Sequence, residues 1–201
     1  MNNFRKILTV GSVSTALAVA LAVPVSAAIT RPNAPASHSV VVSHAVKTKK
    51  VAFRGSYKGT IALLMVGPTG QAATTVKVTS LRGRGTGTYV GAGAISATGS
   101  AAASNQCDEL SGLGSITGAG SKLIFKVVTS ASSQGCAAGT STPTSVSVKG
   151  VAQVTGGSGK YKGVSGTLSF KGSFNVTSNT AGSSESDAFS ATLTGTLAIK
   201  S

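Results

Sequence analysis

The sequence is poor in the residue types from which most enzyme active sites are built. Tryptophan is absent, aromatic residues make up 4% of the chain, and its 201 positions include only 4 acidic residues and 2 histidines. Both histidines, His38 and His44, precede the expected folded domain. A Ser-His-Asp arrangement inside that domain would therefore lack its base.

The few carboxylates form two pairs in polar stretches, which favours a role as loop charge. Asp108 and Glu109 follow Cys107, and Glu185 and Asp187 precede the last expected strand. The alternative is that carboxylates from the two stretches converge for acid–base catalysis or for calcium binding. The residues predict no catalytic group, no metal site and no cofactor.

The first 27 residues have the three parts of a secretory signal. Arg5 and Lys6 form a basic start, residues 7–22 are mostly apolar, and residues 25–27 read Val-Ser-Ala. A membrane anchor is the alternative, but the apolar stretch is diluted by glycine, serine and threonine. We expect a signal helix that is cleaved after Ala27, a secreted or extracellular protein, and no transmembrane span in its mature form.

The chain has only two cysteines, Cys107 and Cys136. Export would carry them into an oxidising compartment, where the simplest outcome for such a pair is a disulfide. The alternative, a zinc or redox pair, normally needs C-x-x-C spacing or a nearby histidine, and the sequence has neither. We therefore predict a Cys107–Cys136 disulfide.

Basic residues far outnumber acidic ones. The chain carries 18 Lys and Arg against 4 Asp and Glu, for a formal net charge of +14. A field of this sign favours anionic partners, and we expect anionic cell-wall or envelope polymers among them. Apart from Lys47, Lys49 and Lys50, the cations are scattered singly, with no nucleic-acid module or aromatic stacking cluster. We do not expect dedicated nucleic-acid binding.

The sequence does contain a hydrophobic pattern with a period of two residues. Apolar and polar residues alternate over several stretches that are separated by Gly-rich turns, as in half-buried strands. These stretches are residues 51–65, 74–81, 123–128, 145–151, 168–176 and 191–200. Residues 83–103 form a Gly/Ala/Thr ribbon that we expect to be bent at its glycines.

This pattern predicts an all-β domain over residues 51–201, built as an antiparallel β-barrel or, alternatively, as a two-sheet sandwich. Residues 28–50, which contain two prolines and both histidines, are expected to form a flexible leader. Because large apolar side chains are scarce, we expect a compact interior rather than a large cavity walled by aromatic residues.

Residues 156–166 read Gly-Gly-Ser-Gly-Lys-Tyr-Lys-Gly-Val-Ser-Gly, and residues 167–172 continue as a strand. The segment resembles the G-G-[ST]-G-[KR]-[FY]-x-x-A-x-G hairpin of the dirigent and allene-oxide-cyclase-like barrels, especially their small secreted bacterial relatives. The resemblance implies eight antiparallel strands, often around a ligand-sized interior. Val164 and Ser165 depart from the plant motif, so no catalytic residue is carried over.

The glycines of this segment are expected to shape a tight turn, with Tyr161 at its base. The turn residues are Gly156, Gly157, Gly159, Gly163 and Gly166. Polar groups that could contact a ligand at a barrel mouth are few. The candidates are Tyr57, Tyr89, Tyr161 and Glu185.

Two functions follow from these features. The first is a non-enzymatic secreted or envelope-associated module with a filled interior, which binds partners or has a structural role. The alternative is a cyclase-like or dirigent-like barrel that acts on a small apolar or phenolic substrate. It would need an open apolar lumen with an inward polar residue.

Overall fold

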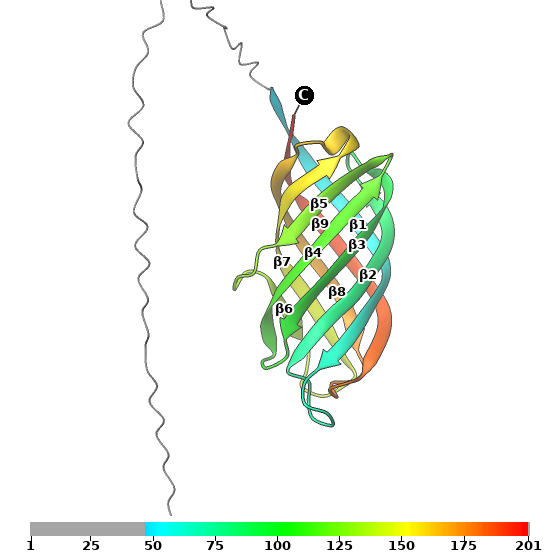
Figure 1. Cartoon of the computed structure of the whole chain (residues 1–201), viewed down its shortest axis with the longest axis vertical. Coiled ribbons are helices and arrows are strands. Elements are labelled where there is room, and N and C mark those ends of the chain that lie inside the picture. Colours follow the sequence, from blue (N-terminus) through cyan, green and yellow to red (C-terminus); the bar gives the residue numbers. More distant parts are fainter. Residues whose placement is uncertain (1–46, 201) are drawn as a thin grey trace, which may run out of the picture. The chain divides into compact units, whose positions relative to one another are not determined.

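The computed structural model describes residues 47–200, so the expected signal peptide (residues 1–27) and most of the expected leader (residues 28–50) lie outside the described residues. The described chain forms nine strands and one short 3-10 turn, η1 (Figure 1). Their bounds are β1 Thr48–Val66, β2 Thr75–Gly87, β3 Gly91–Ala102, β4 Cys107–Gly118, β5 Ser121–Val127, β6 Gln134–Ala137, β7 Thr144–Ser158, η1 Gly159–Tyr161, β8 Ser165–Val176 and β9 Ser184–Lys200. Within residues 47–200, no helix is long and apolar enough to cross a membrane.

The strands close into an antiparallel barrel. β1 pairs with β2 on one side and with β9 on the other, and β3 pairs with β4 to complete the circle. β5 and the short β6 follow one another between β4 and β7 and pair with both, so nine strands fill eight positions. The barrel prediction is confirmed, and the sandwich alternative is wrong.

Strand boundaries differ from those expected at several places. β1 begins at Thr48, so the last three residues of the expected leader belong to the barrel and pair with the end of β9. The ribbon expected over residues 83–103 is the end of β2, a turn and all of β3. The chain reverses at Tyr89 and Gly91, both of which have a φ of 68°. A full turn, rather than a bend, therefore separates these two strands.

The barrel has a closed end, where β1 begins and β9 ends, and an opposite open end. Inward residues of β1 such as Phe53 and Tyr57 are almost fully buried in the closed half. The turns at this end also insert side chains into the lumen. Those of Val90, Tyr161 and Val164 have exposed fractions of 0%, 0% and 3%. Side chains and turns together therefore fill the lumen at the closed end.

Several core rings lie against glycines of neighbouring strands. Gly114 is paired with Phe125, and a Cβ placed on this glycine would lie 2.3 Å from the Phe125 ring. A Cβ on Gly150 would likewise lie 2.6 Å from the ring of its partner Phe170. Contacts this short are impossible for a real methyl group, so these inward positions need glycine.

The glycines of residues 156–166 have different roles. Gly159 and Gly163 adopt φ angles of 62° and 71°, which favour glycine. Gly157 has no room for a side chain, since a Cβ there would lie 2.5 Å from the carbonyl oxygen of Lys122. Gly156, by contrast, faces open space. The turn therefore depends on some of these glycines and not on Gly156.

This difference gives a matched pair of substitutions. Gly157→Ala should lower the free energy of unfolding by about 2 kcal/mol, because the new methyl group collides with backbone and with Tyr161. Gly156→Ala, one residue away, should change it by less than about 0.5 kcal/mol. Urea denaturation followed by far-UV circular dichroism measures both changes. Equal effects would contradict the conclusion that the turn depends on Gly157 and not on Gly156.

Candidate functional site

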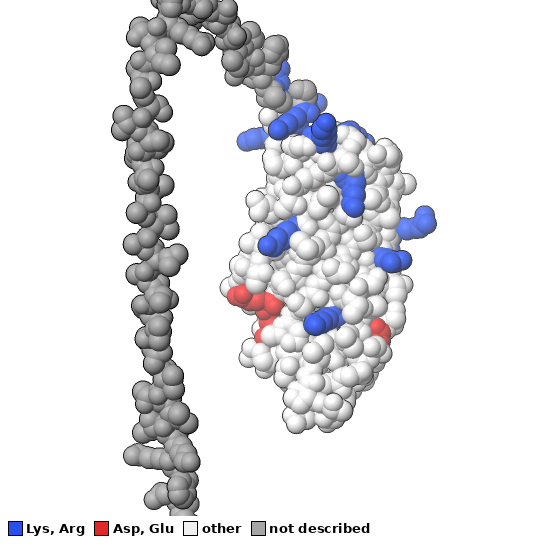
Figure 2. All heavy atoms as spheres, viewed as in Figure 1, with Lys and Arg blue, Asp and Glu red and all other residues white. Residues whose placement is uncertain are grey.

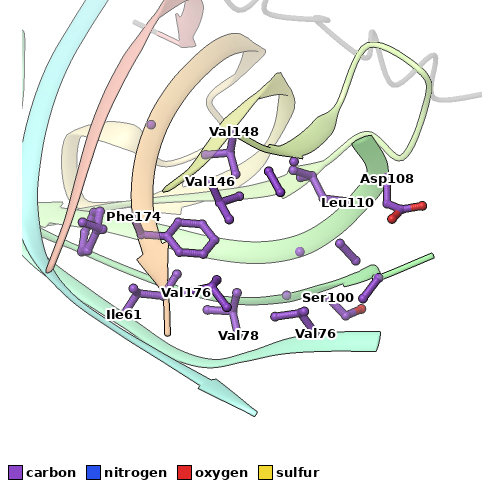
Figure 3. A pocket seen from close by; sticks show the side chains of 18 of the residues that line it. Ile61, Val76, Val78, Ser100, Asp108, Leu110, Val146, Val148, Phe174 and Val176 are labelled. Carbon is purple, nitrogen blue, oxygen red and sulfur yellow. The ribbon is translucent and has the colours of Figure 1, made fainter. Parts of the chain in front are cut away.

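The open half of the barrel contains a cavity of about 490 Å³ (Figure 3). Inward apolar side chains from most of the strands around the barrel line it, and the labelled valines and Phe174 converge on a common space in Figure 3. Prominent among them are Ile61, Val76, Val78, Leu110, Val146, Val148, Phe174 and Val176. The volume lies in the range of pockets that hold small organic ligands.

The cavity exists because, apart from Leu110, the inward side chains on one side of the lumen are small or absent. The inward positions of β3 and β4 in this half include Ala97, Gly99, Ala101 and Gly112, all of which line the cavity. Valines of β2 and β7, namely Val76, Val78 and Val146, are too short to fill the gap and remain partly exposed. The expectation of a compact interior is therefore wrong for this half, because the scarcity of large side chains leaves space.

The mouth of the cavity lies among the loops of the open end. Small residues of the β1–β2 loop, Ala72 and Ala73, and the polar residues Ser104 and Asn105 of the β3–β4 loop border it. The β1–β2 and β8–β9 loops are joined by backbone bonds, including Ala73 N–H to the Asn179 carbonyl at 2.7 Å. The described loop residues that line the cavity at this end are small or polar, whereas the turns of the closed end bury Val90, Tyr161 and Val164.

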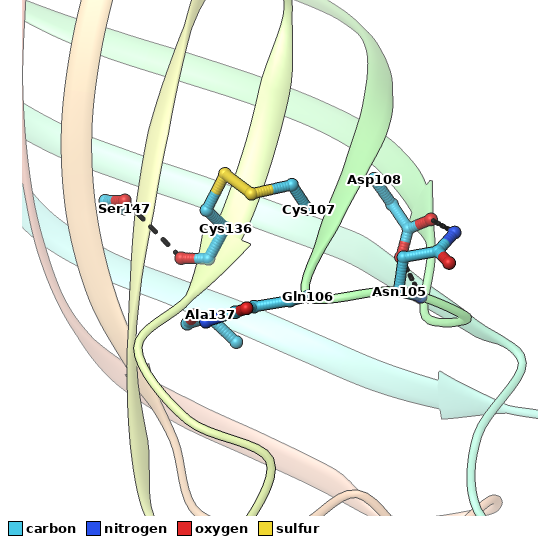
Figure 4. The surroundings of a disulfide bond; sticks show 7 residues. All are labelled: Asn105, Gln106, Cys107, Asp108, Cys136, Ala137 and Ser147. Carbon is cyan, nitrogen blue, oxygen red and sulfur yellow. Dashed lines mark hydrogen bonds between the residues drawn. A yellow bond between two sulfur atoms is a disulfide. The ribbon is translucent and has the colours of Figure 1, made fainter.

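The predicted disulfide is confirmed, and it lies beside this mouth (Figure 4). Cys107 on β4 and Cys136 on β6 occupy directly opposite positions, with Cα atoms 4.1 Å apart. β6 spans only Gln134–Ala137, so backbone pairing with its neighbours gives it few hydrogen bonds. The disulfide therefore fixes the shortest strand of the wall next to the cavity.

Asp108 organises the β3–β4 loop at the same edge. Its carboxylate accepts hydrogen bonds from the backbone N–H groups of Ser104 and Asn105 and from both of their side chains, at 2.9–3.1 Å. Burial alone would raise the pKa of Asp108, but these hydrogen bonds outweigh it and hold that pKa below its usual value. Its oxygens are occupied in shaping the loop.

Glu185 and Asp187 were expected in a loop, but both lie on β9, near its start. Backbone pairing between β8 and β9 ends at Ser173. Beyond this residue, hydrogen bonds to the two carboxylates take the place of backbone hydrogen bonds between the strands. Asp187 accepts the N–H of Asn175 at 2.7 Å, and Glu185 accepts the N–H and hydroxyl of Thr177. Their observed contacts bridge two strands, and Glu185 is not among the residues that line the cavity.

The three tyrosines also lie apart from the cavity. Tyr57 and Tyr161 are buried in the closed half, and neither hydroxyl has a hydrogen-bond partner. Burial, and secondly the neighbouring Tyr161, raise the pKa of Tyr57 to about 12. Burial, and secondly Tyr89, also raise the pKa of Tyr161, while Tyr89 itself is 46% exposed in the β2–β3 turn. The tyrosines thus form a cluster at the closed end.

The lining offers little for acid–base chemistry. Among the described residues that form it, only Asp108 and Lys171 are ionisable, and Lys171 occupies an outward, exposed position of β8. Residues 47–200 contain no group of three or more potential metal ligands. Such a cavity can enclose an apolar molecule by excluding water from it.

The sequence suggests the tyrosines as ligand contacts, but the side chains that line the cavity are largely valines. Val76, Val146 and Val148 follow the ordinary alternation of a strand, so their pattern is the same as that of packed core residues. Only the small residues elsewhere around the lumen leave these valines lining a cavity.

The comparisons with family models, with curated proteins and with solved structures gave no match. The class that the structure defines is a closed eight-stranded antiparallel barrel with a half-hollow lumen. The resemblance of residues 156–166 to the dirigent and allene-oxide-cyclase-like hairpin stays a prediction.

The buried hydroxyl of Tyr57 gives a prediction of opposite sign to that expected for a hydroxyl that makes a stabilising hydrogen bond. Because the hydroxyl has no partner, Tyr57→Phe should raise the free energy of unfolding at pH 7, by about 1 kcal/mol. The folded-state pKa lies above the unfolded value, so wild-type stability is fully present below about pH 10 and is lost as the pH rises towards 12. The variant should lose less stability over that range.

Urea denaturation at pH 7 and at pH 11 measures both effects, with Tyr89→Phe as the exposed control. A loss of more than about 1 kcal/mol at pH 7 for Tyr57→Phe would show that the hydroxyl has a stabilising partner. That result would contradict the assignment of this tyrosine to a dry, purely structural core.

Proposed function

We propose that this protein is an exported barrel that binds a small, uncharged apolar molecule in its open half without converting it chemically. The observation that carries this proposal is the cavity of about 490 Å³, lined by valine and phenylalanine side chains that remain partly exposed. Covering these side chains with an apolar ligand would remove their surface from water, which is favourable in proportion to the area covered.

The charges around the cavity support a neutral ligand. The chain has four carboxylates, and all of them lie on β4 or β9, near their open-end termini. Among the described lining residues, the one cation, Lys171, occupies an outward position. A ligand carboxylate would have no partner inside and would lose its hydration, at a large cost in free energy. A long-chain alcohol or an isoprenoid fits these conditions better than a fatty acid does.

A binding role is better supported than the cyclase-like alternative. That alternative needs an inward polar residue that can act on a substrate in the lumen. Tyr57, Tyr89 and Glu185 were the candidates, and none of them lines the cavity. Asp108 lies at the edge of the cavity, but its oxygens already accept hydrogen bonds from the adjacent loop.

Displacement of a neutral fluorescent probe, N-phenyl-1-naphthylamine, tests the proposal. Dodecanol should displace the probe at a concentration at least about tenfold lower than dodecanoate, because the acid would bury an unpaired charge. Val148→Phe, which adds a ring inside the cavity, should weaken probe binding by about tenfold.

The control is Val151→Phe, an outward position of the same strand, β7, which should leave probe binding unchanged. Equal effects of the two substitutions would place the probe outside the lumen and contradict the proposal. Tighter binding of dodecanoate than of dodecanol would contradict the neutral ligand class.

A further inference from the structure

The arginines of the described chain are concentrated on one part of the outer wall. Residues 47–200 contain three arginines, and all three lie on outward, exposed positions of β1 and β2. With the exposed lysines on the same face of β1 they form what we call the basic stripe. Its members are Lys50, Arg54, Lys58, Arg82 and Arg84.

The register of the two strands places like charges together. Lys58 is directly opposite Arg84, and Arg82 is opposite Thr60, the next outward residue of β1 after Lys58. Side chains directly opposite one another on a sheet are close neighbours, and like charges at such positions destabilise the pairing. The fold therefore holds these cations together at a cost in stability.

The neighbouring strands do not offset this repulsion. The residues paired with the stripe on β9 and β3 are uncharged: Ala198, Thr194, Ser190, Ser96 and Ala94. The two carboxylates on β9, Glu185 and Asp187, bond instead to the end of β8. A cation cluster without an internal counter-charge is suited to an external anion.

The shape of the stripe indicates a linear anion. From Lys50 to Lys58 it runs along roughly 26 Å of strand. The arginines add planar guanidinium groups, which form paired hydrogen bonds with phosphate oxygens. The stripe begins near the closed end, where Lys160, Lys162 and Lys200 extend the positive field, and Figure 2 shows basic side chains gathered towards this end.

We propose that the basic stripe binds a linear polymer of phosphate groups. Stacking on successive nucleic-acid bases needs several exposed aromatic side chains; the stripe has none, and the adjacent β2–β3 turn exposes one, Tyr89. Insertion into a lipid bilayer needs exposed apolar side chains. Two that the barrel exposes, Leu113 and Ile124, lie on β4 and β5 and not on the strands of the stripe, β1 and β2. The site is outward and separate from the cavity, so the polymer would hold the barrel while its lumen stays accessible.

The test compares two triple variants of equal charge. Arg54→Ser/Arg82→Ser/Arg84→Ser removes the arginines of the stripe. Lys126→Ser/Lys149→Ser/Lys171→Ser removes three exposed lysines from β5, β7 and β8, including the directly opposed pair Lys149 and Lys171. Binding of the purified protein to inorganic polyphosphate is measured by titration calorimetry from about 50 to about 300 mM salt.

The arginine variant should bind polyphosphate at least about tenfold more weakly, and its plot of log affinity against log salt should be flatter by about 2 units. It should also unfold at a higher urea concentration than the wild type, because the repulsion is relieved. The lysine variant should lose less than about threefold in affinity.

Equal losses in the two variants would show a diffuse charge effect and would overturn the proposal. Tighter binding of oligo-deoxythymidine than of polyphosphate of equal charge would overturn it in favour of a nucleic acid. Binding to phosphatidylglycerol vesicles that exceeds binding to polyphosphate, and that is lost in the arginine variant, would overturn it in favour of a membrane surface.

Discussion

Contact between aromatic rings and inward glycines determines how this barrel is filled. The rings of Phe125, Phe170 and Phe189 lie so close to Gly114, Gly150 and Gly83 that a methyl group on any of these glycines would overlap a ring. Each missing side chain on one strand gives space for a ring from another. A chain with 4% aromatic residues can in this way still close its lumen at mid-height.

The same rings separate the two halves of the lumen. Phe125, Phe170 and Phe189 also line the cavity, so they form its floor. On one side of this floor Tyr57, Tyr161 and the turn residue Val90 complete a dry core. On the other side the small residues of β3 and β4 leave space that Phe174 and the valines do not fill, and the lumen stays hollow. The disulfide and the bridging carboxylates then hold the wall around that hollow half.

The strands could be predicted where the two faces of the chain differ. β1, β8 and β9 alternate large apolar with polar residues, and the alternation over residues 51–65, 168–176 and 191–200 predicts most of their length. β3 carries mostly glycine and alanine inward and alanine, serine and threonine outward, so its two faces differ little and the sequence predicts only a bent ribbon there. β4 has Gly112, Gly114 and Gly118 on its inward face, and the sequence predicts no strand over residues 107–118.

The cavity and the basic stripe could not be predicted from the sequence, because they depend on which residues meet across the lumen or across a strand pair. The like-charge contact of Lys58 with Arg84, for example, follows from the register alone, which no local pattern contains.

A crystal structure determined under xenon pressure tests most directly whether the lumen is divided in this way. Xenon enters apolar cavities that are empty of side chains, so the account predicts xenon among Val76, Val146 and Phe174 and none around Tyr57. An open half closed by its own side chains, or xenon bound beside Tyr57 instead, would contradict the account.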